Sequence, residues 1–420
     1  MAQDNNKLIA SIDIGTKHTR ILVGEQEPNG AVHIEGYGKS LSRGVIGGRV
    51  VDINKVSESI SEAMNQVNKR FNRKLLLIHF ISSVSDLHMT IHNSKGRTPI
   101  KDQKITAKDI ESALFSAAIP NPTNKQIIDT FVTSYFISGQ DINQFELVPS
   151  PLGMEASGLE IITHNISISN SAINNIASAV RLANKAEVID YYIESMASAA
   201  AILTQSEKNR GAIVIDIGSN ITSFSIYVDG SIFHNGILDF GGDNINEIIA
   251  QSFAIDVMSA EYLKINYGKL EANISEKDKL ISLEIKIQGK IVIKYLSSMD
   301  LYEALGDAYD SLLEKIKKEI FSIKNFKFQK IKSGIYLTGG GSNISGIEAK
   351  TRRLLNINVK KGSVNRDFIH GEEKILADPE YSASLGLFNL WLQKQQVPTE
   401  ESVTQKSDIG SKIGAWLKNF

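Results

Sequence analysis

A segment that occurs twice, at residues 8–30 and again at residues 212–230, constrains the fold of this chain more than any other feature. The first copy reads LIASIDIGTKHTRILVGEQEPNG and the second reads AIVIDIGSNITSFSIYVDG. In each copy a β-branched run leads to Ile-Asp-Ile-Gly, a polar turn follows, and a second apolar run ends at Asn-Gly or Asp-Gly. These dipeptides favour the tight turns that join antiparallel strands. We therefore expect two halves, each opening with a β-hairpin whose first turn carries Asp-Ile-Gly.

The first turn of each hairpin has the composition of a phosphate-binding loop. Gly15 and Gly218 allow a ligand to approach bare backbone, and nearby N–H groups with the Thr16 and Ser219 hydroxyls can hold phosphate oxygens. A single Ile-Asp-Ile-Gly is more often only a strand that ends at a turn. Because the pattern is duplicated, we favour two turns that face each other and clamp a triphosphate.

An aspartate precedes the glycine in both turns. Asp13 and Asp216 can hold a magnesium ion through water, because magnesium keeps much of its hydration shell. We expect this ion to accompany the phosphates where the two turns meet.

A third element, SGIYLTGGGSNISGI at residues 333–347, combines an apolar run with three glycines. Residues 335–338 read as a buried strand, and Ser342 or Asn343 can cap the helix that we expect next. Such a loop lets a nucleotide lie against backbone at a helix N-terminus. A tight strand-to-helix turn with no ligand is an equally good interpretation. The residues that we expect at the nucleotide are Gly339, Gly340, Gly341 and Ser342.

A fourth element at residues 240–268 has a glycine pair, then a helical stretch, then Ala-Glu-Tyr-Leu-Lys. Gly242 is the second glycine of the pair. Glu261 and Lys264 are three residues apart and share one helix face. A surface ion pair between them is the commoner outcome of this spacing. The functional alternative is that they bond a ribose or a base.

Composition excludes several classes of function. The chain has 420 residues, a net charge of −1 and no cysteine. A near-neutral charge gives no reason to expect a nucleic-acid partner, and the lack of cysteine excludes disulfides and thiolate catalysis. We see neither a signal peptide at the N-terminus nor an apolar stretch long enough to span a bilayer, so a cytoplasmic location is the default.

The end of the chain reads as a polar linker followed by a short amphipathic helix. Residues 392–408 lack periodicity and contain Pro398, whereas residues 409–420 place five apolar side chains on one helix face. That helix can pack on its own domain, enter a groove of a partner, or lie in a membrane interface. Its tryptophan and lysines favour an anionic membrane surface. The side chains concerned are Ile409, Ile413, Trp416, Leu417 and Phe420, with Lys412 and Lys418 beside them.

These elements, in this order, resemble the actin-like ATPase superfamily, which includes sugar kinases, the 70-kilodalton heat-shock chaperones and bacterial actins. Over nearly the full length the chain is similar to the FtsA family of bacterial cell-division proteins. SRGVIGGRVVDINKV (42–56), DPEYSASLGL (378–387) and the C-terminal amphipathic helix carry that resemblance. It implies an α/β fold of the duplicated actin-like type, in which two domains flank a cleft for ATP and Mg²⁺. A small subdomain is inserted into the first domain.

The resemblance also implies limits for each part of the chain. Within the inserted subdomain, ITAKDIESALFSAAI reads as a helix and KQIIDTFVTSYFI as a strand. The expected division is 7–82 with 165–193 for the first core, 83–164 for the insertion, 194–250 with 333–390 for the second core, 251–332 for its outer subdomain, 391–408 for the linker and 409–420 for the membrane helix.

Further site residues follow from matching the family's loops. The first phosphate loop is DIGTKHT, where Lys17 stands ahead of His18 and takes over a phosphate contact unless the register turns it elsewhere. The second is DIGSNIT, which adds Asn220 to the contacts. Glu194 lies where the superfamily positions a water, although a structural carboxylate is an equally good interpretation. The second loop reads Gly-Ser-Asn-Ile-Thr rather than the Gly-Gly-Gly-Thr of many relatives, so we expect at most a weak ATPase.

As a member of that family, the chain would self-assemble and tether FtsZ filaments to the cytoplasmic face of the cell membrane at midcell. It would help to build the Z ring and recruit later division proteins. The FtsZ C-terminal tail would dock in or beside residues 312–334, where Lys317, Lys318 and Lys324 would steer an acidic peptide. The simpler alternative is that these lysines only mark a solvated helix face. Two other functions remain open on this fold, a small-molecule kinase and a pilus-assembly actin homologue.

Overall fold

Each copy of the repeated segment forms a β-hairpin, as predicted, and each hairpin begins one of the two main sheets. We describe a computed structural model, which places residues 8–72, 74–75, 79–139, 144–271, 278–287 and 290–395. The first turns of the two hairpins follow β1 (Leu8–Ile14) and β12 (Ala212–Ile217). On its other side β1 pairs in parallel with β6, and β12 pairs in parallel with β17, so the duplication extends beyond the hairpins.

The first domain is a six-stranded sheet in the order β11-β6-β1-β2-β3-β19. Helices α1 (Ile53–Arg70) and α3 (Asn170–Asn184) pack on one of its faces through a cluster of buried aliphatic side chains. The remaining strands of this sheet are β2 (His18–Gln26), β3 (Val32–Leu41), β6 (His79–Val84), β11 (Glu187–Ile193) and β19 (Ile369–His370).

The second domain is a five-stranded sheet in the order β14-β13-β12-β17-β18. Its outer face is covered by α6 (Gly242–Phe253), α8 (Ser298–Ser322) and α9 (Ile347–Leu355). Its other strands are β13 (Thr222–Val228), β14 (Ser231–Leu238), β17 (Gly334–Thr338) and β18 (Val359–Lys361).

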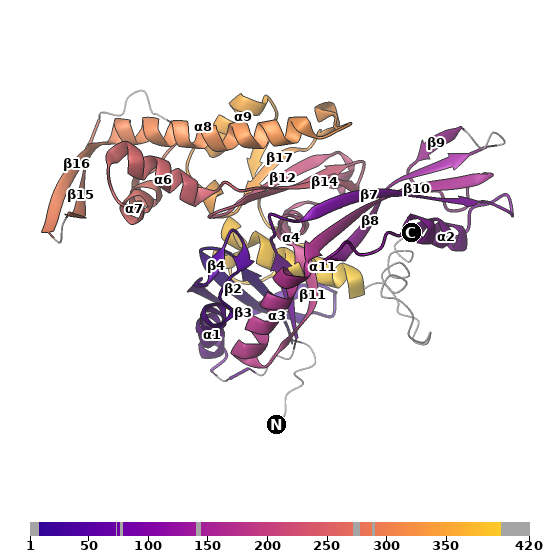
Figure 1. Cartoon of the computed structure of the whole chain (residues 1–420), viewed down its shortest axis with the longest axis horizontal. Helices are drawn as coiled ribbons and strands as arrows, with labels where there is room; N and C mark the ends of the chain where they lie inside the picture. The colour runs from indigo at the N-terminus through magenta and orange to yellow at the C-terminus, as the bar shows by residue number, and fades with distance from the viewer. Residues whose placement is uncertain are drawn as a thin grey trace.

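Two helices, α4 (Glu194–Ile202) and α11 (Ser382–Gln395), lie between the sheets and share one apolar core with both of them (Figure 1). The small residues of α4 let the two helices approach closely. A Cβ added at Gly386 would lie 1.7 Å from the Ala197 carbonyl oxygen. This crossing therefore connects the domains through backbone contact rather than through long side chains.

The inserted subdomain is a four-stranded sheet, β7-β10-β8-β9, with one helix packed on it. The predicted helix and strand are both present: Thr106 caps α2 (Ala107–Ala117), and β8 spans Lys125–Ser138. The other strands are β7 (Thr90–Pro99), β9 (Phe145–Val148) and β10 (Gly158–Ser169).

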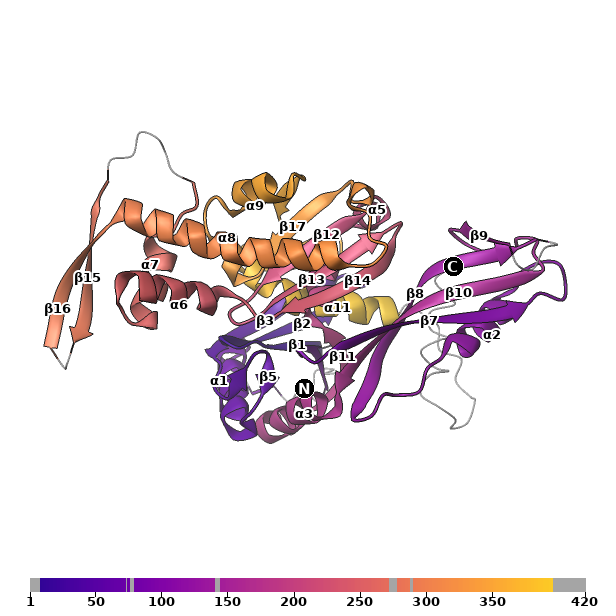
Figure 2. The same cartoon turned by 45° about the horizontal axis from the view of Figure 1, so that its top comes forward.

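At the opposite end of the molecule, α7 (Val257–Tyr267) and the hairpin of β15 (Leu280–Ile287) and β16 (Lys290–Ser297) form an outer subdomain together with α8 (Figures 1 and 2). Aliphatic side chains that repeat with helical spacing along α8 are buried, among them Leu305, Leu312, Leu313, Ile316 and Ile320. Short elements complete the fold: β4 (Val45–Ile46), β5 (Arg49–Val50), α5 (Gln205–Asn209), α10 (Glu373–Leu376), and 3-10 turns η2 (Phe328–Lys330), η3 (Gly340–Asn343) and η4 (Pro379–Tyr381).

Three expectations about the C-terminal third were wrong. Residues 333–390 do not all belong to the second domain, because β19 pairs with β3 of the first sheet. The linker does not begin at residue 391, because α11 continues to Gln395 and buries Leu392 against the interdomain core. Neither Ser342 nor Asn343 caps a helix: a 3-10 turn follows the glycines, and α9 begins only after Gly346.

The predicted amphipathic helix, residues 409–420, lies outside the described residues. None of the helices in the described part has both the length and the apolar character needed to span a bilayer.

Candidate functional site

A cavity of about 300 Å³ lies between the two domains, and most of the residues that we predicted to bind nucleotide line it. Its walls come from both repeated turns, the starts of α4 and α6, the middle and C-terminal end of α7, and the triple-glycine loop. The volume is at the lower end of the range for small-molecule sites. The predicted residues on its wall are Asp13, Gly15, Thr16, Lys17, Glu194, Asp216, Gly218, Ser219, Gly242, Glu261, Lys264, Gly339, Gly340 and Gly341.

Strand alternation explains why both aspartates reach this cavity. Successive side chains of a strand point to opposite faces of its sheet. Asp13 therefore shares a face with Ile9, and Asp216 shares a face with Val214, and both of these apolar residues belong to the core between the sheets. Each aspartate is the last residue of that face before its turn, so the two carboxyls meet at the edge of the interdomain core.

An equivalent backbone hydrogen bond closes each of the two repeated turns. Gly15 N–H donates to the His18 carbonyl at 3.1 Å, and Gly218 N–H donates to the Ile221 carbonyl at 2.9 Å. In the first turn the Thr16 hydroxyl accepts from the Gly48 N–H at 3.1 Å, which leaves the hydroxyl proton available to a ligand.

The second turn differs from the prediction because an acidic side chain occupies its polar groups. The Ser219 hydroxyl donates to Asp243 at 2.7 Å, and the Asn220 amide donates to the same carboxylate at 3.0 Å. Ser219 still lines the cavity, whereas Asn220 lies outside its wall. The start of α6 also holds this turn, since the N–H groups of Gly242 and Asp243 donate to the carbonyls of Gly218 and Ser219.

The triple-glycine loop lies against the second hairpin so closely that side chains would not fit. A Cβ at Gly339 would lie 2.2 Å from Asp216 Oδ1, and one at Gly341 would lie 2.3 Å from the Ile217 side chain. Gly339 also has a φ of +80°, which L residues rarely adopt. Ser342 is turned away, because its hydroxyl donates to the Gly339 carbonyl at 2.7 Å, and Asn343 lines the cavity instead.

Helix α7 contributes two side chains that do not pair with each other. Lys264 donates to the Gly242 carbonyl at 2.8 Å. Glu261 pairs with Lys17 from the first turn, so this contact joins the two domains across the cavity. The prediction of a surface ion pair between Glu261 and Lys264 is therefore wrong. Lys17 is turned toward α7 in this structure.

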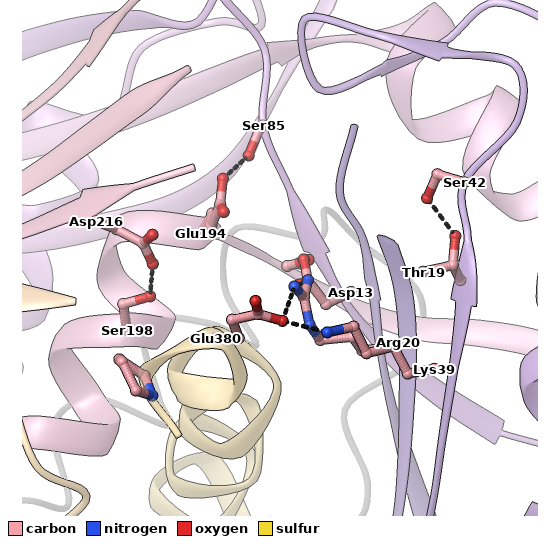
Figure 3. A network of polar contacts seen from close by, with 12 residues as sticks. Asp13, Thr19, Arg20, Lys39, Ser42, Ser85, Glu194, Ser198, Asp216 and Glu380 are labelled. Carbon is pink, nitrogen blue, oxygen red and sulfur yellow. Dashed lines mark hydrogen bonds and ion pairs between the residues drawn. The ribbon is translucent and has the colours of Figure 1, made fainter. Parts of the chain in front are cut away.

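Helix α4 brings a second carboxyl beside Asp216. Glu194 is the first residue of the helix and accepts from the Ser85 hydroxyl, while Ser198, one turn later, donates to Asp216 (Figure 3). Burial, reinforced by the charges of Asp216 and Asp13, raises the pKa of Glu194 to about 8. Burial and the charge of Asp13 also raise the pKa of Asp216 to about 6, against the hydrogen bond from Ser198.

Sequence reasoning missed a group of three charged residues at the first turn. Arg20 of β2 donates to Asp13 at 3.2 Å and to Glu380 at 3.0 Å, and Lys39 of β3 donates to the same Glu380 oxygen (Figure 3). Burial alone would raise the pKa of Glu380, but the two cations outweigh it and hold the pKa at about 2. The hairpin register, which places Arg20 opposite Asp13, was a signal that the sequence did offer.

The cavity fits a nucleotide better than it fits a free metal ion. Bare glycine backbone from three loops faces one space, as close contact with phosphates and a nucleoside requires. Both oxygens of Asp13 are already engaged, one by Ser83 at 2.7 Å and one by Arg20. Within the described part of the chain, no group of three or more acidic or histidine side chains is arranged to hold a metal ion.

The remaining predicted residues do not belong to this cavity. Lys317 and Lys318 lie on α8, and Lys324 follows that helix; Lys318 and Lys324 are exposed, and Lys317 lies 3.6 Å from Glu314. The membrane residues from Ile409 to Phe420 lie outside the described part of the chain.

Comparisons with known proteins match two family models to the chain. The model described as cell division protein FtsA matches residues 213–386, and the model described as the SHS2 domain inserted in FTSA matches residues 87–167. The second match coincides with the four-stranded inserted subdomain.

Sequence relatives carry the same description over nearly the whole chain. The cell division protein FtsA of Pseudomonas aeruginosa is 30% identical over 406 residues, which cover 96% of this chain and 94% of the relative. That of Neisseria meningitidis serogroup B is 27% identical over 422 residues, which cover 100% and 99%.

Solved structures show the same fold at lower identity. The PilM-PilN type IV pilus biogenesis complex matches with a TM-score of 0.62 at 18% identity, covering 91% of this chain and 98% of the other. MreB5 of Spiroplasma citri bound to ADP matches with a TM-score of 0.55 at 12% identity, covering 91% and 95%. At these identities the likeness concerns the actin-like fold alone.

Proposed function

The chain belongs to the FtsA family of cell-division proteins, and from this premise we propose that it is an ATP-binding adaptor that self-assembles and tethers FtsZ filaments to the cytoplasmic membrane. One observation carries the nucleotide part of this proposal: two equivalent turns and a triple-glycine loop face a single cavity between the domains. Family membership carries the division part. In this role the protein helps to assemble the Z ring at midcell and recruits later division proteins.

The residues on the cavity wall suggest how ATP would lie. The phosphates would bind the backbone of the two repeated turns, with the Thr16 hydroxyl donating to one of them. The nucleoside would lie between the triple-glycine loop and α7, where Glu261 and Lys264 offer an acceptor and a donor for the ribose. Glu261 can take this role only if the Lys17 contact opens, which would free Lys17 for a phosphate. Magnesium would arrive with the phosphates and neutralise part of their charge, with Asp216 facing it through water.

Nucleotide binding offers a route to self-assembly because the cavity has walls from both domains. A ligand that contacts both repeated turns favours one relative position of the two sheets, by the free energy of those contacts. Helices α4 and α11 fill the interdomain layer and would transmit that position to the outer surfaces. We propose that this orientation is the one that assembles.

The same geometry argues for slow hydrolysis at most. A general base must be deprotonated at the working pH, and burial keeps Glu194 protonated up to a pKa of about 8. We therefore propose that Glu194 orients a water rather than removing its proton efficiently. ATP would act chiefly as a structural ligand.

The amphipathic helix predicted at residues 409–420 would supply the membrane contact. Burying its five apolar side chains would give roughly 7–15 kcal/mol gross, at about 1.5–3 kcal/mol each. Interfacial burial is incomplete, and folding so short a helix consumes part of the gain. A single copy would therefore bind weakly and reversibly, whereas a filament with many copies would bind firmly through avidity.

Vesicle sedimentation tests the adaptor function. We expect full-length protein with ATP to sediment with anionic vesicles, and we expect a chain truncated after Lys406 to stay in the supernatant. Trp416→Glu should reduce binding, while the matched change Asn419→Glu, off the apolar face, should leave most of it. Equal sedimentation of the full-length and truncated chains would refute membrane tethering by this segment.

A small-molecule kinase on the same fold is the second candidate. It would be supported by phosphate transfer from ATP that depends on an added sugar or similar acceptor. The likeness to the pilus protein rests on fold alone, whereas the division proteins match in sequence over nearly the full chain.

A further inference from the structure

Arg20 is a buried cation that is fixed on two sides at the wall of the cavity. Its side chain is 11% exposed. One end of the guanidinium donates to Asp13 at 3.2 Å and the other to Glu380 at 3.0 Å (Figure 3). The contacts tie β2 to the neighbouring strand and to the segment that leads into α11. A side chain held in this way cannot swing out of the cleft without losing its contacts to two carboxylates.

Each acidic partner of Arg20 also accepts a second hydrogen bond from the protein. Glu380 also accepts from Lys39, and Asp13 also accepts from the Ser83 hydroxyl at 2.7 Å. The charge of Asp13 is therefore already compensated by the protein. A divalent cation brought to Asp13 would compete with a hydrogen bond at each oxygen and would meet the repulsion of a guanidinium at hydrogen-bond distance.

The guanidinium still has a hydrogen-bonding deficit. Arg20 Nε is buried and has no hydrogen-bond partner among the described residues. An unsatisfied buried donor is costly, and guanidinium groups match phosphate oxygens in geometry. Because Nε is itself closed off from solvent, a phosphate in the cavity would meet the guanidinium chiefly through its charge.

The other cations of the cavity wall have different partners. Lys17 pairs with Glu261, and Lys264 donates to the Gly242 carbonyl at 2.8 Å. Both lie toward α7, on the side that we assign to the nucleoside. Arg20 instead donates to Asp13, the side chain beside which the sequence led us to expect magnesium.

We propose that Arg20 is a resident cation at the phosphate end of the cleft, which lets this chain bind ATP with little dependence on magnesium. The inference rests on the proposed function, since it needs ATP to occupy the cavity. It concerns the residues around Asp13 and leaves open that magnesium accompanies the phosphates when it is present.

The test is an equilibrium titration of the full-length protein with a fluorescent ATP analogue, once with excess Mg²⁺ and once with EDTA. For the wild-type protein we expect the two dissociation constants to agree within about threefold, because the fixed guanidinium supplies charge in both buffers. A loss of more than about tenfold in EDTA would overturn the inference. This comparison needs no variant and so does not depend on how a variant folds.

A double variant, Arg20→Met with Glu380→Gln, removes the cation and one of its anionic partners together, which limits the number of unpaired charges. We expect its affinity to fall more than about tenfold when Mg²⁺ is removed. Arg20→Lys keeps a cation and should stay close to wild type. Arg43→Gln, on an arginine that pairs with exposed Glu58 and Glu62 outside the cavity, is the matched control.

The outcomes separate the two proposals. If the double variant shows the same small magnesium effect as wild type, Arg20 is not the resident cation. If no protein binds the analogue in either buffer, ATP binding itself is wrong and the inference falls with it. Thermal melting of each variant without ligand, followed by circular dichroism, establishes that the comparison is between folded proteins.

Discussion

Burial of the Glu194 carboxyl predicts that this protein loses stability as the pH rises. Its pKa is about 8 in the folded protein against 4.5 for the free side chain. Between these values the folded state holds a proton that the unfolded state has released. The free energy of unfolding therefore falls with rising pH. Glu194→Gln removes the titrating group, and the amide oxygen can still accept the Ser85 hydroxyl, so the variant isolates the ionisation.

The expected magnitude follows from proton linkage. One proton bound only in the folded state changes the unfolding free energy by about 1.4 kcal/mol per pH unit. From about pH 5.5 to about pH 7.5 the Glu194 contribution is thus about 2–3 kcal/mol. His18 and His164 act in the opposite direction, because burial lowers the pKa of each, to about 3 and about 4. They are present in both proteins, so the difference between wild type and variant cancels them.

Urea unfolding at several pH values measures this difference. Trp391 lies on α11, which packs against both sheets, so its fluorescence reports loss of the interdomain core. We expect wild type to lose about 2–3 kcal/mol more than Glu194→Gln over this range. Glu111→Gln, on the exposed side of α2, should follow wild type. Parallel pH profiles for wild type and Glu194→Gln would refute the burial argument.

Two further predictions concern packing and partner binding. Gly386→Leu should lower the unfolding free energy by at least the roughly 1–3 kcal/mol of ordinary overpacking. The reason is that even a Cβ at this position would lie 1.7 Å from the Ala197 carbonyl oxygen. Thermal melting measures the loss, and an unchanged melting temperature would contradict the close crossing of α4 and α11. Changing Lys317, Lys318 and Lys324 to Glu should weaken binding of the FtsZ tail peptide and reduce the salt dependence of that binding. Fluorescence anisotropy of a labelled peptide measures both quantities. If affinity and salt dependence are both unchanged, these lysines are not part of the proposed interface.

Local sequence pattern was sufficient for several parts of this protein. Both repeated hairpins, the helix over residues 107–117 and the buried strand at 334–338 form where the pattern predicts them. Turn dipeptides, helix caps and apolar periodicity act over a few residues, so their structural effect can be read directly. The duplication added the expectation that the two turns face one ligand, and they do line one cavity.

Other parts depended on contacts that local pattern does not encode. Residues 369–370 form a strand of the first sheet, although the strand before them, β18, belongs to the second. Ser342 had the composition of a helix cap, but its hydroxyl bonds the Gly339 carbonyl because the chain turns in a 3-10 conformation there. Asn220 had the composition of a phosphate ligand, yet Asp243 holds its amide.

The sequence by itself determined the family, the two turns and the glycine loop, because each is a local pattern with a local structural cause. The hairpin register even placed Arg20 opposite Asp13. Only the tertiary structure supplied Glu380 as the second partner of Arg20, and only it made Glu194 a carboxyl that retains its proton. The physical reason is that apolar periodicity reports which face of an element is buried, whereas the partner that covers this face is decided by how the two sheets close around α4 and α11.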